Sequence, residues 1–371
     1  MSILNLFVSS GASIGAGLRG SISWVLIAVF SATTFGCILP SMSATELPED
    51  PIAFTYWAKD GSKKRFNLFE KADELPPIPI GGGDRGLHQE NEIRAWLSAE
   101  KSLSLQSRLA AKPGRLMLLW PRTGEMVKVE AAPPGSHPLA WSSDHKRLLF
   151  SSAHRGGKEQ LYEYHLDSKV LRTVTSGPEE HPRGDYADDG RIVVLRLKRA
   201  LSAGASLQTV HLAGRGGRLG PAIADGIPPG ALRMTPRGDR LVYEQVLSRR
   251  RSGGPTAYQS MIATRSLENS TQEQLLLKGR EPALTPDGEW IVFASPSSAG
   301  YRLRRMRSDG TARVPISPGG TEERMPSVSP DGQFVVFVQL VNGYRRLTVR
   351  RFDGKSEMRL LKNGWSEFPV W

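Results

Sequence analysis

A short motif repeats five times between residues 138 and 337, and it constrains the fold more than any other feature of the chain. In each copy a bulky apolar residue is followed by a polar turn, often Pro-Asp-Gly, and then by an apolar strand. The turn positions 144, 189, 237, 287 and 331 are separated by 45, 48, 50 and 44 residues. An even period of about 47 residues indicates one supersecondary unit that is stacked several times.

Each copy is predicted to contain four strands. In the turn, Pro presets φ, Asp bonds to its own backbone and Gly accepts a positive φ, which together favour a tight hairpin. A third strand follows the hairpin, for example at 346–350, and a second turn leads to a fourth strand, for example at 358–361. Four strands in 40 to 50 residues are typical of a β-propeller blade.

These copies, clearest as Val-Ser-Pro-Asp-Gly at 328–332 and Leu-Thr-Pro-Asp-Gly at 284–288, resemble the WD40-like (PD40) repeats of the TolB family. The resemblance covers about residues 113–371. It implies six blades, a location in the periplasm and an export signal. TolB proteins also carry a small N-terminal α/β domain, and residues 51–112 are too short to form it.

The two ends of the repeat region predict how the ring closes. In each copy a proline precedes the bulky apolar residue, which is here called the anchor of the repeat. The chain stops at Phe368-Pro369-Val370-Trp371, which resembles the start of a sixth copy without its hairpin. Residues 115–120 and 126–129 look like outer strands that lack an inner one. We therefore expect an all-β, six-bladed β-propeller whose C-terminal strand completes the N-terminal blade, since closure removes free sheet edges.

Three segments are expected: an export or anchor segment at 1–44, an extension at 45–112 and the propeller at 113–371. In the extension, 52–57 and 65–69 are predicted to form a hairpin that either supplies the missing strand of the shared blade or starts a seventh blade. Residues 75–86 form a Pro/Gly-rich linker, and 90–111 are predicted to be helical.

The first 44 residues have the pattern of an export signal. Arg19 precedes eighteen uncharged residues at 22–39, and Glu46, Glu49 and Asp50 follow. Three outcomes stay open: cleavage near residue 44, retention as a membrane anchor, or lipidation of Cys37, the chain's only cysteine. Each of them predicts a periplasmic or other extracytoplasmic protein, with membrane contact through the N-terminal segment or a lipid on Cys37.

Residues just before the anchor prolines should ring one mouth of the central channel. They are His137, His181, Glu281, Met325 and Phe368. Imidazoles and a carboxylate near one axis could bind a metal or transfer a proton. Because blades stand apart, we expect only some pairs to meet, and we interpret the ring as an interaction surface without catalytic or metal-binding residues.

Arginines gather on the third strands of the last two full repeats. They are Arg302, Arg304, Arg305, Arg307, Arg345, Arg346, Arg350 and Arg351. One interpretation is a basic flank that binds an acidic partner or anionic polymer. The other is a solvated strand whose charges prevent edge pairing.

The chain has 49 Lys+Arg against 37 Asp+Glu, one Cys and seven His without an HExxH motif. This composition excludes a disulfide scaffold and a CxxC-type zinc cluster, and no cofactor is predicted. We expect a non-enzymatic interaction propeller that acts as a scaffold or accessory subunit of an envelope or membrane complex. The alternatives are a propeller-mouth hydrolase or lyase and a binder of anionic glycan. Nucleic acid is not an expected partner outside the cytoplasm, and no homo-oligomer is implied.

Overall fold

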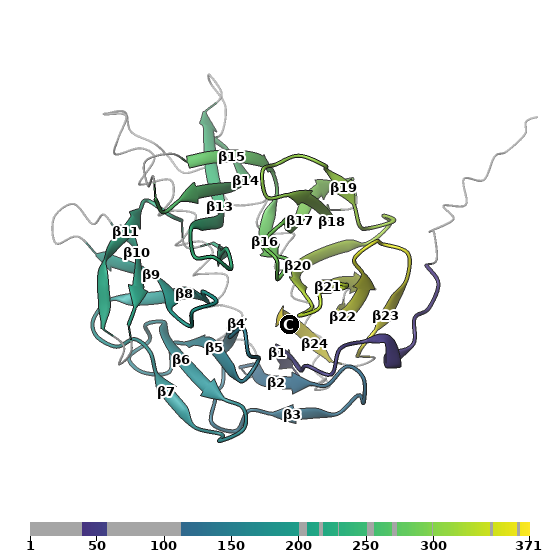
Figure 1. Cartoon of the computed structure of the whole chain (residues 1–371), viewed down its shortest axis with the longest axis horizontal. Coiled ribbons are helices and arrows are strands. Elements are labelled where there is room, and N and C mark those ends of the chain that lie inside the picture. Colours follow the sequence, from purple (N-terminus) through teal and green to yellow (C-terminus); the bar gives the residue numbers. More distant parts are fainter. Residues whose placement is uncertain are drawn as a thin grey trace, which may run out of the picture. The chain divides into compact units, whose positions relative to one another are not determined.

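The computed structural model describes residues 39–57, 113–199, 206–214, 218–228, 230–250, 256–268, 273–298, 300–341, 344–361 and 364–371. Their strands form six four-stranded antiparallel sheets, arranged as blades around a common centre (Figure 1). The predicted all-β, six-bladed propeller is confirmed. A 3-10 helix, η1 (Ala44–Glu46), precedes the first strand.

The blades are numbered along the chain, and the innermost strand of each is given first. Blade 1 contains β24 (Trp365–Val370), β1 (Ile52–Trp57), β2 (Arg115–Leu119) and β3 (Met126–Lys128). Blade 2 contains β4 (His137–Trp141), β5 (Arg147–Ser152), β6 (Gln160–His165) and β7 (Leu171–Thr173). Blade 3 contains β8 (Glu180–Tyr186), β9 (Ile192–Arg199), β10 (Ser206–Ala213) and β11 (Leu219–Asp225).

The remaining blades follow the same order from the centre outward. Blade 4 contains β12 (Leu232–Met234), β13 (Arg240–Arg250), β14 (Thr256–Ser266) and β15 (Glu273–Lys278). Blade 5 contains β16 (Arg280–Leu284), β17 (Trp290–Ser297), β18 (Gly300–Arg307) and β19 (Val314–Pro315). Blade 6 contains β20 (Glu322–Val328), β21 (Phe334–Val341), β22 (Tyr344–Arg351) and β23 (Glu357–Arg359).

The repeated turn joins the two inner strands of a blade. In blade 6 the Ser329 hydroxyl donates to the Asp331 carboxylate at 2.5 Å and accepts from the backbone N–H of Phe334 at 2.9 Å. Gly332 follows with φ +71°, a conformation that glycine adopts without a steric cost. In blade 2, His145 occupies this place with φ +53°. The local chemistry of the motif therefore sets the inner hairpin of blades 2 to 6, whereas the two inner strands of blade 1 come from distant parts of the chain.

The ring closes at blade 1, as predicted. β24 pairs with β1, and β1 pairs with β2, so the C-terminal strand is the innermost strand of the first blade. The indole N–H of Trp371 donates to the carbonyl of Asp50 at 3.1 Å. Of the two alternatives for 52–57, the structure shows the one that supplies the missing strand. β1 therefore belongs to the propeller, although its residues were expected in the extension.

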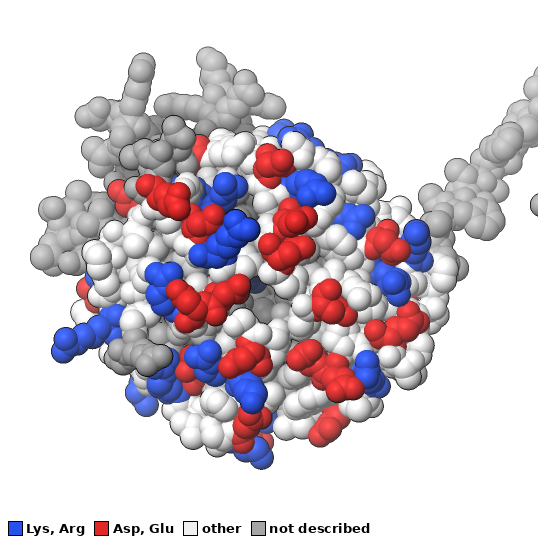
Figure 2. All heavy atoms as spheres, viewed as in Figure 1, with Lys and Arg blue, Asp and Glu red and all other residues white. Residues whose placement is uncertain are grey.

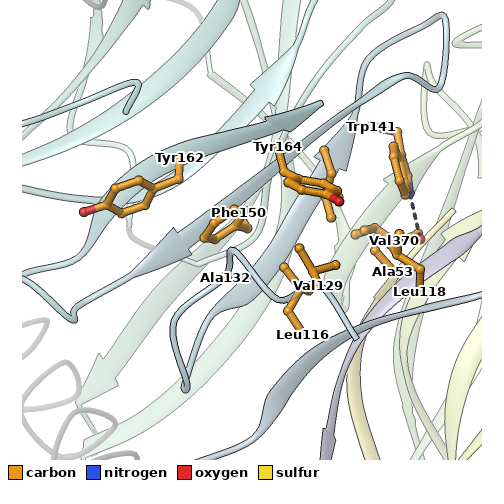
Figure 3. Packing of buried hydrophobic residues seen from close by; sticks show 11 residues of the cluster. Ala53, Leu116, Leu118, Val129, Ala132, Trp141, Phe150, Tyr162, Tyr164 and Val370 are labelled. Atoms are coloured by element: carbon orange, nitrogen blue, oxygen red, sulfur yellow. Dashed lines mark hydrogen bonds between the residues drawn. The ribbon is translucent and has the colours of Figure 1, made fainter. Parts of the chain in front are cut away.

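The hydrophobic core lies between neighbouring blades. Figure 3 shows the cluster between blades 1 and 2, where Leu116 and Leu118 of β2 face Phe150 of β5 and Tyr164 of β6. The indole N–H of Trp141 donates to the carbonyl of Val370 at 3.3 Å and joins the two innermost strands (Figure 3). The second strand from the centre is buried on both faces in this way, as in β5 and β21, which is why both alternate positions of such a strand carry apolar residues.

Several predicted segments lie outside the described residues. They are Cys37 with most of the export segment, the second strand of the hairpin at 65–69, the linker at 75–86 and the helix at 90–111. Within the part of the chain that the structure describes, no helix has the length and apolar character needed to cross a membrane.

Candidate functional site

The residues predicted for the channel mouth lie where the innermost strands become irregular. The pairing of β8, β16, β20 and β24 with the next strand shifts by one residue at the X-Pro step. Such a bulge fits proline, which has no N–H to pair, and it redirects the residue before it. Glu281, Met325 and Phe368 accordingly have φ values of +55°, +54° and +53°.

These redirected residues connect one blade to the next. Glu281 of blade 5 accepts the backbone N–H of Met325 of blade 6 on its Oε2 at 2.7 Å. The Sδ of Met325 accepts the N–H of Phe368 of blade 1 at 3.4 Å. The Phe368 ring packs edge-on against the ring of His137 of blade 2, with centroids 4.8 Å apart. Four of the five predicted residues therefore form a row across four consecutive blades, here called the mouth row.

Arginine–glutamate pairs surround the mouth row in blades 4 to 6. Arg324 holds Glu281 with two hydrogen bonds, Nε to Oε2 at 3.0 Å and Nη2 to Oε1 at 2.5 Å. The Nε of Arg280 donates to Oε1 of Glu244 at 2.8 Å. Burial opposes the ionisation of Glu281, but the charge and hydrogen bonds of Arg324 outweigh it and hold the pKa of Glu281 below its usual value. Glu281 therefore carries a structural negative charge at neutral pH.

His181 does not join this row. It is 2% exposed, and its Nδ1 lies 3.0 Å from Oε1 of Gln160. The Gln160 amide nitrogen donates to the carbonyl of Glu179 at 2.7 Å, which orients the amide so that His181 Nδ1 carries the proton. Burial lowers the pKa of His181 to about 4. Within the described residues its Nε2 has no hydrogen-bond partner.

The predicted basic flank is not one exposed surface, because two of its arginines are buried ion-pair partners. Arg350 is 0% exposed and bonds to both carboxylate oxygens of Glu323, at 2.7 and 2.9 Å, and to Glu357. Arg345 is 2% exposed, pairs with Glu367 and lies 5.0 Å from the ring centre of Trp365. Burial of a guanidinium requires such carboxylate partners, and strand pattern alone did not identify them.

The remaining arginines of the flank are dispersed. Arg305 packs between the Phe352 and Trp290 rings, Arg307 pairs with Glu289 at 3.2 Å, and Arg351 pairs with Glu46 at 3.2 Å. Arg346 donates to the carbonyl of Gly364. Arg302 and Arg304 are half-buried and form no ion pair with any described residue. Figure 2 shows Lys and Arg interspersed with Asp and Glu around a central hollow.

Two arginines on innermost strands were missed by the sequence interpretation. Arg183 lies on β8 and Arg233 on β12, each between the proline and the bulky apolar residue of its repeat. The Nη1 atoms of both donate to backbone carbonyls: Arg183 to Pro182 at 3.0 Å, Arg233 to Leu139 at 3.0 Å. An arginine between the proline and the bulky apolar residue of a repeat is the sequence signal that could have identified them. Among the described residues, no group of three or more His, Cys, Asp or Glu is placed to hold a metal ion.

No family model and no curated protein matches the sequence. Solved structures match the fold. A TolB protein of Agrobacterium tumefaciens has 22% sequence identity and a TM-score of 0.52, and the match covers 66% of this chain and 87% of that one. TolB of Acinetobacter baumannii has 17% identity and a TM-score of 0.56, with 87% of this chain and 66% of that one covered.

Hydrazine synthase of Kuenenia stuttgartiensis has 14% identity and a TM-score of 0.57, over 88% of this chain and 47% of that one. This chain therefore spans about half the length of that enzyme chain and about two thirds of the Acinetobacter TolB. Identities this low establish the fold and leave the activity open, since one fold supports many functions. The chain has the six-bladed β-propeller fold of the TolB proteins.

Proposed function

We propose that the chain is a non-enzymatic protein-interaction propeller, exported from the cytoplasm, that acts as a scaffold or accessory subunit of an envelope or membrane complex. The observation that carries this proposal is that the acidic and imidazole groups predicted for the mouth are engaged in hydrogen bonds and ion pairs within the fold. Glu281 binds Arg324 and the backbone of Met325, and His181 is neutral and buried against Gln160. These groups act as links between strands and blades.

Three residues of the mouth row are partly exposed and can be contacted by a partner. His137, Met325 and Phe368 are each partly accessible, and Phe368 and His137 already form an aromatic pair. Aromatic side chains are enriched among the residues that dominate binding energy, and methionine is enriched at interfaces. The row lies on a rigid closed ring, so little conformational freedom is lost when a partner binds.

The docking test replaces Phe368 by Ser and compares it with Tyr344→Ser, a change of a 41% exposed aromatic on β22 outside the mouth row. Each purified variant carries a photo-crosslinker, is added to solubilised membranes, and its cross-linked partner is identified by mass spectrometry. Phe368→Ser is expected to reduce the recovery of the partner at least tenfold, and Tyr344→Ser to leave it unchanged. Equal recovery with both variants, in chains that melt like the wild type, contradicts docking at the mouth row.

Export and membrane attachment have a separate test. Mass spectrometry of the N-terminus after expression with an intact leader distinguishes the three outcomes. A diacylglyceryl group on Cys37 supports lipid tethering, a free terminus near residue 44 supports release after cleavage, and an intact Met1 supports an anchor. A chain that stays in the cytoplasm with its leader intact contradicts the proposed location.

A further inference from the structure

The four arginines on the innermost strands fall into two classes. On the side of blades 5 and 6, Arg280 and Arg324 form ion pairs with Glu244 and Glu281. On the side of blades 3 and 4, neither Arg183 nor Arg233 lies within 4 Å of a carboxylate oxygen of any described residue. Arg183 and Arg233 are therefore not held by ion pairs with described residues, although the buried carboxyl of Asp185 lies close enough to Arg233 for their charges to interact.

Arg233 reaches across the channel side of blade 3. It starts on β12, and its Nη1 donates to the carbonyl of Leu139 on β4, two blades away. β8, the innermost strand of blade 3, contacts both β4 and β12 and therefore lies between them. Because blade 3 fills the space behind β8, the guanidinium can bridge β12 and β4 only along the channel. Among the described residues, Arg233 forms hydrogen bonds only through Nη1, so Nε and Nη2 are donors without a described partner.

Arg183 lies on the neighbouring strand and faces the same way as Asp185. Residues two apart on a strand share one side, and Asp185 is turned toward β12, where its Oδ2 accepts the N–H of Met234 at 2.9 Å. Asp185 also accepts the N–H of Tyr186, so it is held by two backbone donors. The only hydrogen bond of Arg183 to described residues is to the carbonyl of Pro182. Arg183 and Arg233 are each half-buried.

We propose that Arg183 and Arg233 together bind a carboxylate or phosphate group inside the central channel. A guanidinium presents its donors in a planar fork that matches the oxygens of such groups, and two forks on neighbouring innermost strands can bind one anion together. Half-burial in the channel strengthens this attraction relative to bulk water. An acidic side chain of the docking partner is one source of the anion, which rests on the proposed function, and a free small anion is the other.

The test is calorimetric titration of the purified full chain with inorganic phosphate, with sodium chloride adjusted to keep the ionic strength constant. The variants are Arg183→Gln, Arg233→Gln and both together, and the matched control is Arg237→Gln, an exposed arginine in the β12–β13 turn. The double variant is expected to lose at least tenfold in affinity, and the control to bind like the wild type. Arg233→Lys keeps the charge without the fork and should give an intermediate loss.

Wild-type affinity in the double variant, or an equal loss in the Arg237→Gln control, overturns the proposal. If Arg233→Gln does not fold, Arg183→Gln and Arg233→Lys carry the same test. Titration with an end-blocked tetraglutamate peptide and with glutarate, at equal carboxylate concentration, identifies the source. Tighter peptide binding supports a partner's acidic segment, and equal binding supports a free anion. If the wild-type chain binds phosphate through these arginines but the cross-linking test recovers no partner, only the proposed function is contradicted.

Discussion

The carboxylate of Glu281 accepts the backbone N–H of Met325 at 2.7 Å and thereby joins the innermost strands of two consecutive blades. The same carboxylate neutralises Arg324, whose side chain is 4% exposed. Replacing Glu281 by Gln leaves this buried guanidinium without its main partner. We expect a loss of about 3 kcal/mol in the free energy of unfolding at pH 7, measured by urea denaturation.

The control for this change is Glu289→Gln, which breaks an exposed pair with Arg307 and should cost less than about 1 kcal/mol. The pKa of Glu281 is lowered in the folded state, so its contribution is complete above the ordinary carboxyl pKa and is lost as the pH falls through the folded pKa. The difference between wild type and variant should therefore shrink in acid. A difference that is constant down to acid pH would contradict this origin.

Arg350 is expected to be essential to blade 6 although it is a charged residue on a strand. Its replacement by Met leaves Glu323, 1% exposed, and Glu357 without their cation. The expected cost is about 3–5 kcal/mol. Arg359→Met, an exposed position on β23, should change stability by less than about 0.5 kcal/mol. Similar melting temperatures for the two variants would show that the burial of Arg350 is not supported by its carboxylates.

The seam between the chain ends has its own test at Gly364. Gly364 has φ +77°, and an added Cβ would overlap the Tyr56 ring of β1. Gly124 has φ +76° with nothing within 4 Å of an added Cβ. Both changes to Ala carry the same backbone cost of about 1 kcal/mol. Only Gly364→Ala should in addition disrupt the pairing of β24 with β1, seen as a lower melting temperature than that of Gly124→Ala.

His181 predicts an acid-sensitive step in stability. Its pKa is about 4 in the folded chain, against 6.5 in its unperturbed form, because burial disfavours the imidazolium. The unfolded chain therefore binds a proton between these values that the folded chain does not. The stabilising effect of neutral His181 is complete above pH 6.5 and is lost as the pH falls toward 4, by up to roughly 3 kcal/mol.

His181→Asn keeps a donor toward Gln160 and removes the titration, so its stability should depend less on pH between 6.5 and 4. His165→Asn, a partly exposed position on β6, should keep the wild-type dependence. Unfolding free energies at a series of pH values test both. A pH profile of His181→Asn that coincides with the wild type would rule out this role.

The propeller could be predicted because its signals are local. A Ser or Thr hydroxyl, a proline, an aspartate and a glycine within five residues make the turn by themselves, as in Ser329 and Asp331. The unfinished anchor at 368–371 likewise predicted the closure. These signals depend on neighbours in the sequence, so one chain was enough to interpret them.

The ion pairs could not be predicted in the same way. Arg324 pairs with Glu281, which lies 43 residues away on the adjacent blade 5. Arg350 pairs with Glu323, which lies 27 residues away. Which residues face each other depends on strand register and on the bulge at each X-Pro step. Both faces of a blade's third strand are covered by neighbours, so alternation does not separate a buried Arg350 from an exposed arginine. The basic flank was inferred from arginine clusters on matching third strands of two repeats, a pattern that does not show which of these arginines are buried.

The pairing of β1 with β24 also determines how long β1 stays without a partner strand during synthesis of the chain. β1 and β24 are more than 300 residues apart in the chain. At about 5–20 residues per second, synthesis of the intervening chain takes roughly 15–60 s. Throughout this interval β1 (Ile-Ala-Phe-Thr-Tyr-Trp) has no inner neighbour, and its free edge is a template for unwanted pairing. The edge of β1 is therefore protected from unwanted pairing only if blade 1 folds late or if another molecule covers this edge until β24 is available.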